Sequence, residues 1–172
     1  GSTVIKLFDM TAAVTGLNEK AAKAAGIEYS RVYGYWGHHA GYYPGAENMT
    51  VKTLFDPATG RILGAQITGG AGVDKRIDVL ATAIRSGLTA ADLAELELAY
   101  APPYSSAKDP VNMTGFMIEN VRAGIVRQYF WDDVAALPRD GSVTLLDVRS
   151  EKEYAGGHIE GTVNIPLDEL RG

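Results

Sequence analysis

Residues 49–68, with the sequence MTVKTLFDPATGRILGAQIT, decide the fold of the first part of the chain. Two runs in which apolar and polar residues alternate, Met49–Phe55 and Arg61–Thr68, flank the residues DPATG. Alternation with a period of two is typical of half-buried strands, and Pro and Gly supply the turn geometry. The stretch therefore predicts a β-hairpin with a loop of about five residues.

The residues on both sides of this hairpin predict further strands and helices. β-branched, aromatic and capping residues before the hairpin indicate two strands and a helix: Thr3–Phe8, Ile27–Gly37, and a helix capped by Asn18 and ended by Gly26. Apolar spacing and capping residues after it indicate three helices: Val73–Ser86 closed by Gly87, a short one capped by Thr89, and one that begins at Asp109-Pro110 and runs to about Arg122.

A boundary near residues 124–128 separates this part, residues 1–124, from a second pattern over residues 128–172. The second pattern predicts two strands and two helices: helix Trp131–Leu137, strand Val143–Val148, a helix capped by Ser150, and strand Val163–Ile165. The apolar run Val143–Val148 indicates a strand buried on both faces. We therefore expect the opening of an α/β unit with a parallel sheet, truncated at Gly172 before its core closes.

Composition limits the function classes. The formal net charge of −5 argues against nucleic acid and anionic membrane surfaces as partners. No apolar run approaches the roughly 18–20 residues of a membrane span, and no signal peptide is recognisable, so we expect a cytoplasmic protein. The chain has no Cys, which excludes a thiol nucleophile and a zinc thiolate site. His38 and His39 would point to opposite faces of an extended segment, so a metal site there is not expected.

Two stiff loops carry tyrosines. One holds Tyr42 and Tyr43 in GYYPG, and the other holds Tyr100 and Tyr104 in YAPPYS. A phenol on such a loop can donate a hydrogen bond or a proton, although packing at an interface is the commoner role of such a side chain.

The helix Val73–Ser86 follows a glycine-rich stretch. Gly69-Gly70-Ala71-Gly72 lacks the spacing of a phosphate-binding loop and predicts a tight strand-to-helix turn. The mixed charges that follow predict a solvated face, from which Lys75 or Arg76 can meet a phosphate.

Longer motifs resemble known families. Four motifs within residues 6–124 are similar to the C-terminal dimerisation domain of pyridine nucleotide–disulfide oxidoreductases, in the coenzyme A disulfide reductase and NADH oxidase branch: KLFDMT (6–11), TGLNEKAA (15–22), YYPG (42–45) and AYAPPYSSAKDPVNMTGFMIEN (99–120). The string LLDVRSEKEYAGGHIEGTVNIP (145–166) resembles the start of a rhodanese domain. Asp147, Arg149 and His158 match scaffold positions of that family, and without Cys this chain cannot itself transfer sulfur.

The resemblance implies an α+β domain, an antiparallel sheet with packed helices, that forms a homodimer interface. It implies a parent in which NAD(P)H reduces FAD, and FAD reduces a Cys that forms a mixed disulfide with coenzyme A. The FAD- and NAD-binding domains would lie upstream of Gly1, and the fragment alone would bind no cofactor and be inactive. A parent that forms water or peroxide from oxygen, and a stand-alone dimerisation or binding module, are the alternatives.

The same resemblance implies site residues. Tyr104, and either Tyr42 or Tyr43, would reach into the active site of the partner subunit and protonate the leaving coenzyme A thiolate. Alternation along an extended segment would let only one of Tyr42 and Tyr43 face the site. Lys75 and Arg76 are candidates for contacts to the phosphates of coenzyme A. The attached rhodanese-like part suggests that the parent handles persulfides or polysulfides.

Overall fold

The protein is described by a computed structural model over residues 1–171. It forms two compact units, Gly1–Arg127 and Gln128–Gly172. No helix within the described residues is long and apolar enough to cross a membrane. Each unit is considered by itself.

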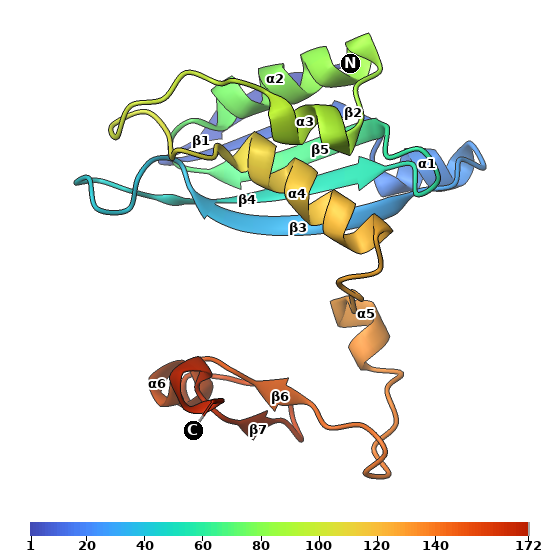
Figure 1. Cartoon of the computed structure of the whole chain (residues 1–172), viewed down its shortest axis with the longest axis vertical. Coiled ribbons are helices and arrows are strands. Elements are labelled where there is room, and N and C mark those ends of the chain that lie inside the picture. The colour runs from blue at the N-terminus through green and yellow to red at the C-terminus, as the bar shows by residue number, and fades with distance from the viewer. Residues whose placement is uncertain (172) are drawn as a thin grey trace. The chain divides into compact units, whose positions relative to one another are not determined.

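The first unit is built on a five-stranded antiparallel sheet (Figure 1). In spatial order its strands are β1 (Thr3–Leu7), β2 (Met10–Gly16), β5 (Ile62–Gly69), β4 (Asn48–Phe55) and β3 (Ser30–Gly37). The α+β class expected from the resemblance is thereby confirmed. The predicted hairpin is β4–β5, in which Thr53 pairs with Ala65. Asp56 Oδ1 accepts the backbone N–H groups of Ala58 and Thr59, which closes the turn.

Strand β2 was not predicted. After β1 the chain reverses at Phe8 and Asp9, so that Leu7 pairs with Met10. Such a two-residue turn needs a positive φ, for which Gly or Asn is the usual signal. Phe8 takes this conformation instead, with φ at 53°, and the sequence therefore gives no turn signal here.

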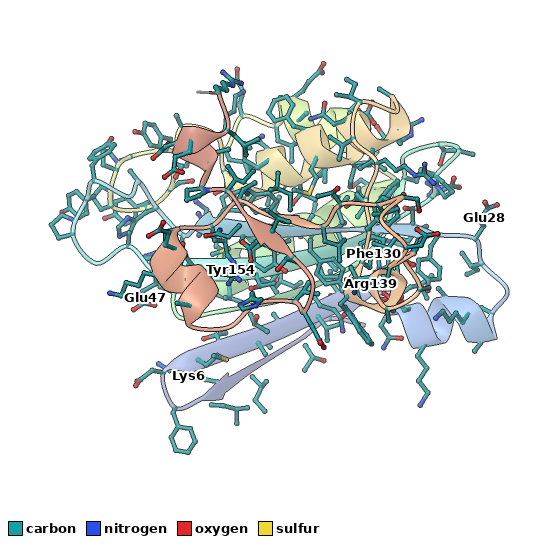
Figure 2. All side chains as sticks on the ribbon, turned by 90° about the horizontal axis from the view of Figure 1, so that it is seen from below. Lys6, Glu28, Glu47, Phe130, Arg139 and Tyr154 are labelled. Carbon is teal, nitrogen blue, oxygen red and sulfur yellow. The ribbon has the colours of Figure 1, made fainter. Side chains whose placement is uncertain are left out.

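The resulting hairpin exposes apolar side chains. Phe8 at its tip is 97 % exposed, and four neighbours are more than half exposed: Val4, Ile5, Leu7 and Met10. Figure 2 shows the hairpin, on which Lys6 lies, at the edge of the sheet. Large apolar side chains exposed to this extent on an edge hairpin are typical of an interaction surface.

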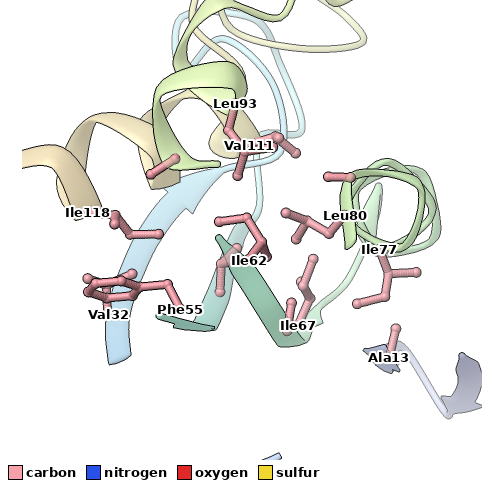
Figure 3. Packing of buried hydrophobic residues seen from close by; sticks show 14 of the residues in the cluster. Ala13, Val32, Phe55, Ile62, Ile67, Ile77, Leu80, Leu93, Val111 and Ile118 are labelled. Atoms are coloured by element: carbon pink, nitrogen blue, oxygen red, sulfur yellow. The ribbon is translucent and has the colours of Figure 1, made fainter. Parts of the chain in front are cut away.

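Three helices cover one face of the sheet (Figure 1). They are α2 (Val73–Ser86), α3 (Ala90–Glu95) and α4 (Pro110–Arg122), and their bounds agree with the prediction. Helix α2 packs on β5 and β2, while α4 packs on β3, β4 and α3. Figure 3 shows the core between these layers, where Leu80, Leu93 and Ile118 meet Phe55 and Ile67. Each of these five side chains is fully buried.

The short helix α1 (Glu19–Ala24) is tied to the sheet by a cluster of charges. Asn18 caps the helix, as predicted, by accepting the N–H of Ala21. The carboxylate of Glu19 pairs with Arg31 on β3 and Lys52 on β4. The hydroxyl of Tyr29 also donates to it, at 3.0 Å. Partial burial alone would raise the pKa of Glu19, but the hydrogen bonds from Lys52, Tyr29 and Arg31 lower it to about 2.

Glu19 should therefore make the stability of the first unit depend on acid pH. Because its folded pKa lies below its unfolded value of 4.5, its contribution is present above pH 4.5 and is lost as the pH falls towards 2. The shift corresponds to about 3 kcal/mol, which screening reduces to about 2 kcal/mol.

We expect Glu19→Gln to lower the free energy of unfolding by about 2 kcal/mol at pH 7 and to flatten its fall between about pH 5 and pH 2. Urea denaturation across this pH range measures both effects. Glu28→Gln is the matched control, because Glu28 is exposed and lies at the periphery of the unit (Figure 2). An unchanged pH profile in Glu19→Gln would contradict the assignment.

The second unit contains α5 (Trp131–Val134), β6 (Leu146–Asp147), α6 (Glu151–Ala155), β7 (Val163–Asn164) and a 3₁₀ turn (Leu167–Glu169). Strands β6 and β7 pair in parallel, as predicted. The expectation that Val143–Val148 is a strand buried on both faces is wrong. Only two of its residues form a strand, and Leu146 and Val148 are about 40 % exposed. Since β6 pairs only with β7 in the described residues, its faces lack the layers that would bury them.

Candidate functional site: two joined tyrosine loops

The first unit brings its two tyrosine loops together. We call residues 38–47 the first tyrosine loop and residues 100–106 the second. The hydroxyls of Tyr42 and Tyr100 lie 3.2 Å apart, one on each loop. The backbone N–H of Ala40 donates to the carbonyl of Ser105 at 3.1 Å. Side chains and backbones thus join two segments that are 58 residues apart in the sequence.

Tight turns fix the shape of both loops. The N–H of Tyr43 donates to the carbonyl of Ala40 at 3.0 Å, and that of Tyr104 donates to the carbonyl of Ala101 at 2.9 Å. Because Tyr42 and Tyr43 lie in a turn, the expectation that they alternate along an extended segment does not apply. The expectation that His38 and His39 point to opposite faces is also wrong, since their ring centroids are 4.1 Å apart.

The tyrosines differ in environment. Tyr42 is 77 % exposed and Tyr104 is 71 % exposed. Tyr43 is only 43 % exposed, and its ring stands edge-on to that of His39 at 5.7 Å. The hydrogen bond with Tyr42 raises the pKa of the Tyr100 phenol, so this fourth tyrosine belongs to the cluster. The sequence indicates Tyr100 as a member of the cluster, because this residue begins the same proline-rich loop as Tyr104.

A cavity of about 490 Å³ lies beside the second tyrosine loop. Its lining combines apolar and aromatic surface with basic residues, and it includes His38, Lys75, Arg76, Tyr100, Pro103 and Tyr104. The Lys75 side chain is 37 % exposed and lies 3.9 Å from the carboxylate of Asp109. An ammonium group beside aromatic walls suits a ligand that has both an anionic and an apolar part.

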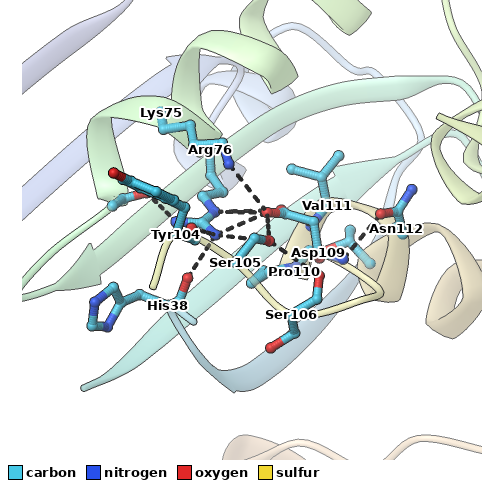
Figure 4. A network of polar contacts seen from close by, with 12 residues as sticks. His38, Lys75, Arg76, Tyr104, Ser105, Ser106, Asp109, Pro110, Val111 and Asn112 are labelled. Atoms are coloured by element: carbon cyan, nitrogen blue, oxygen red, sulfur yellow. Dashed lines mark hydrogen bonds and ion pairs between the residues drawn. The ribbon is translucent and has the colours of Figure 1, made fainter. Parts of the chain in front are cut away.

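Arg76 does not lie on a solvated face, so that expectation is wrong for this residue. It is 1 % exposed, and its guanidinium points inward from α2 (Figure 4). Nη2 donates to Asp109 Oδ2 at 2.8 Å and to the carbonyl of His38 at 2.7 Å. Nε donates to Asp109 Oδ2 at 3.1 Å, and Nη1 donates to the carbonyl of Gly72 at 3.2 Å. The pattern of charges in the sequence does not reveal that Arg76 is buried, because its partner Asp109 follows 33 residues later.

Asp109 holds the other side of this ion pair. It caps α4, as predicted, by accepting the N–H of Val111 at 3.0 Å, and it also accepts the hydroxyl of Ser105 at 2.7 Å. Burial alone would raise the pKa of Asp109, but bonds from Arg76, the Val111 N–H and Ser105 outweigh burial and lower it. Asp109 is therefore an anion that neutralises the buried arginine.

The glycine-rich stretch is a tight turn, as predicted, and does not fit a dinucleotide phosphate. Gly72 has a φ of 72°, and a side chain at this position would collide with the Arg76 guanidinium. The space beside Gly70 is filled by the Glu47 carboxylate. Side chains of the protein itself thus occupy the positions next to Gly70 and Gly72, and the stretch lacks the spacing of a dinucleotide-binding loop. Within residues 1–171, no group of three or more His, Asp or Glu side chains could hold a metal ion.

The candidate residues of the second unit make structural contacts. Arg149 Nη2 donates to Asp147 Oδ2 at 2.7 Å and to the carbonyl of Gly157 at 2.8 Å. The ring of His158 stacks on Tyr154 with centroids 3.8 Å apart. These contacts hold the turn after α6, which agrees with a scaffold role.

The fold defines an α+β domain with an antiparallel sheet, to which a small α/β unit is joined. The family model for the pyridine nucleotide-disulphide oxidoreductase dimerisation domain matches residues 3–110, and that for the rhodanese-like domain matches residues 130–172. The chain belongs to the pyridine nucleotide-disulphide oxidoreductase family, through its dimerisation domain.

Individual proteins similar to this chain include a coenzyme A disulfide reductase and a persulfide reductase. Coenzyme A disulfide reductase from Staphylococcus haemolyticus is 46 % identical over 116 residues, which is 67 % of this chain and 26 % of that protein. The chain therefore spans about a quarter of the length of this curated relative. The crystal structure of reduced Bacillus anthracis CoADR-RHD matches with a TM-score of 0.94 at 50 % identity, over 99 % of this chain and 30 % of that one. A NAD-dependent persulfide reductase from A. fulgidus matches with a TM-score of 0.86 at 40 % identity, with the same coverage of both chains.

Proposed function

We propose that the chain is the dimerisation part of a homodimeric, FAD-dependent NAD(P)H reductase of coenzyme A disulfides, and that it lends tyrosine phenols to the active site of the partner subunit. The observation that carries this proposal is the junction of the two tyrosine loops beside one cavity. The names of the similar proteins supply the substrate class.

The chemistry asked of the phenols is proton donation. Reduction of a disulfide by two electrons breaks the S–S bond and releases a thiolate that must take up a proton. An ordinary phenol has a pKa of about 10 and a thiol a pKa of about 8.5, so a proton is readily shared between them in a partly desolvated site. Tyr104 and Tyr42 are the better donors, because both expose more of the side chain than Tyr43 does.

Lys75 is the better of the two candidates for a phosphate contact. Both residues line the cavity, but the Lys75 side chain is 37 % exposed whereas that of Arg76 is 2 % exposed. The donors of Arg76 are already directed at Asp109 and at backbone carbonyls. Lys75 would therefore bind a phosphate of coenzyme A, while Arg76 stabilises the structure of the first unit.

FAD and NAD(P)H would be held by domains upstream of this chain. The glycine-rich turn does not fit a dinucleotide phosphate, and the chain covers about 30 % of the length of its structural relatives. The role left to the residues described here is to dimerise, to orient the substrate and to donate a proton.

Persulfide or polysulfide reduction is a second candidate. It is favoured by the rhodanese-like match over residues 130–172 and by the persulfide reductase that matches across both units. Comparing turnover of coenzyme A persulfide with that of coenzyme A disulfide by the full-length parent distinguishes the two substrates.

The first experiment is sedimentation equilibrium of the chain, alone and mixed with the separately expressed flavin-binding body of its parent. We expect a dimer that restores NAD(P)H-driven turnover of coenzyme A disulfide on mixing. Oxygen as sole acceptor is the control for an oxidase parent. A dimer that gives no turnover of coenzyme A disulfide, coenzyme A persulfide or oxygen would leave a stand-alone dimerisation module, and a monomer that does not complement would refute both readings.

A further inference from the structure

We propose that Arg76 is a positioning residue that, through Ser105 and Asp109, clamps both tyrosine loops and so sets the place of the Tyr104 phenol. This inference rests on the proposed function and adds a residue to it. It gives the buried ion pair a role beyond stability, because the pair lies next to Tyr104 and Ser105 of the second loop and to His38 of the first (Figure 4).

A single guanidinium reaches both loops. Its Nη2 donates to the carbonyl of His38 on the first loop, at 2.7 Å. The same nitrogen lies 3.4 Å from the carbonyl of Tyr104 and 3.4 Å from the hydroxyl of Ser105 on the second loop. The planar fork of Arg offers five donors in fixed directions, which a point-like ammonium group cannot reproduce.

Asp109 fixes the direction in which this fork points. The carboxylate accepts Nε and Nη2 of Arg76 and also the hydroxyl of Ser105. Both members of the pair have only 2 % of their side chains exposed. Arg76 comes from α2 and Asp109 from the start of α4, and both helices pack on the sheet. The ion pair therefore holds both loops in a fixed position relative to the core of the first unit.

The tyrosines need such a support because they make little packing of their own. The Tyr104 side chain is 71 % exposed, so its ring is not held by a surrounding core. Its backbone, in contrast, is held at the N–H, which donates to the carbonyl of Ala101, and its carbonyl lies 3.4 Å from Arg76 Nη2. A displacement of about 1 Å in a reacting group can lower the rate about 100-fold. A mobile loop would therefore lower turnover even though the phenol itself is unchanged.

The test is a double-mutant cycle in the full-length reductase, with Arg76→Lys, Tyr104→Phe and the two combined. Arg76→Lys keeps the positive charge and loses the fork. We expect it to lower kcat for coenzyme A disulfide about 10-fold or more, with the KM for NAD(P)H unchanged. In the Tyr104→Phe background the same change should lower kcat by a much smaller factor, because most of the effect of Arg76 passes through the Tyr104 phenol and only the rest through Tyr42 on the first loop.

Arg122→Lys is the matched control. Arg122 also donates to backbone carbonyls, those of Pro57 and Ala58, but at the other end of α4. The substitution Arg122→Lys should leave kcat unchanged. If Arg76→Lys does not fold, Ser105→Ala replaces it in the cycle, since it removes one bond of the clamp without a change of charge.

The outcomes separate the two proposals. A loss of kcat from Arg76→Lys that becomes much smaller in the Tyr104→Phe background supports the clamp. Losses that multiply, or a normal kcat in both Arg76→Lys and Ser105→Ala, overturn it. Full activity of Tyr104→Phe overturns the proposed function itself, whatever the effect of Arg76→Lys.

Discussion

Replacing Tyr104 by Phe is expected to lower the turnover of coenzyme A disulfide by the full-length parent about 100-fold. The substitution removes only the hydroxyl that we propose as proton donor to the leaving thiolate. Because the side chain is 71 % exposed, the loss of one oxygen should change the free energy of unfolding by less than about 0.5 kcal/mol. Steady-state kinetics, with NAD(P)H oxidation followed by absorbance, measures the effect.

Two comparisons make this result specific. Tyr35 on β3 is also 71 % exposed, so Tyr35→Phe is a matched control that should retain full turnover. Within the first tyrosine loop, Tyr42→Phe should lower turnover more than Tyr43→Phe does, because the Tyr42 hydroxyl lies 3.2 Å from that of Tyr100. Reduction of the flavin by NAD(P)H should stay normal in every variant. Equal turnover in Tyr104→Phe and Tyr35→Phe would refute the proton-donor role.

The sequence was informative about the fold wherever local signals agreed with packing. Helix α2 shows this, because its apolar spacing, its preceding glycine turn and the closing Gly87 all pointed to the same bounds. Strand β2 shows the opposite, since the turn before it uses Phe8 where the rules expect Gly or Asn. In the second unit, the apolar composition of Val143–Val148 indicated burial that one partner strand does not supply.

The candidate site could be predicted in its parts but not in its assembly. The residue types and stiff backbone of the two tyrosine loops are visible in the sequence. Their junction depends on the pair Tyr42–Tyr100, which only the fold brings together. Arg76 lies in a run of mixed charges, and its burial depends on the ion pair with Asp109, whose side chain is equally buried. Pairings between distant segments carry no periodic signal, so sequence reasoning missed them.

The largest effect on stability is expected from Arg76→Met, which leaves Asp109 buried without its main partner. Breaking a buried ion pair by removing one member costs about 3–5 kcal/mol, which corresponds to a fall in Tm of about 10 °C for a chain of this size. Urea denaturation followed by circular dichroism measures the loss. Arg122→Met is the control, because the Arg122–Glu119 pair lies at the surface and should be worth less than about 1 kcal/mol.

The pH dependence of this loss identifies its cause. Arg76 helps to hold the pKa of Asp109 below its ordinary value against the effect of burial, so Arg76→Met raises that pKa. Protonation then relieves the unpaired charge, and the gap in unfolding free energy between the two proteins should narrow as the pH falls from 7 towards 4. Glu19 contributes to both proteins alike and cancels from the difference. Adding Asp109→Asn to Arg76→Met should recover part of the stability at pH 7, since the amide keeps the shape without the charge. A gap that stays constant with pH, and no recovery in the double variant, would mean that lost packing of the arginine rather than a stranded carboxylate destabilises the protein.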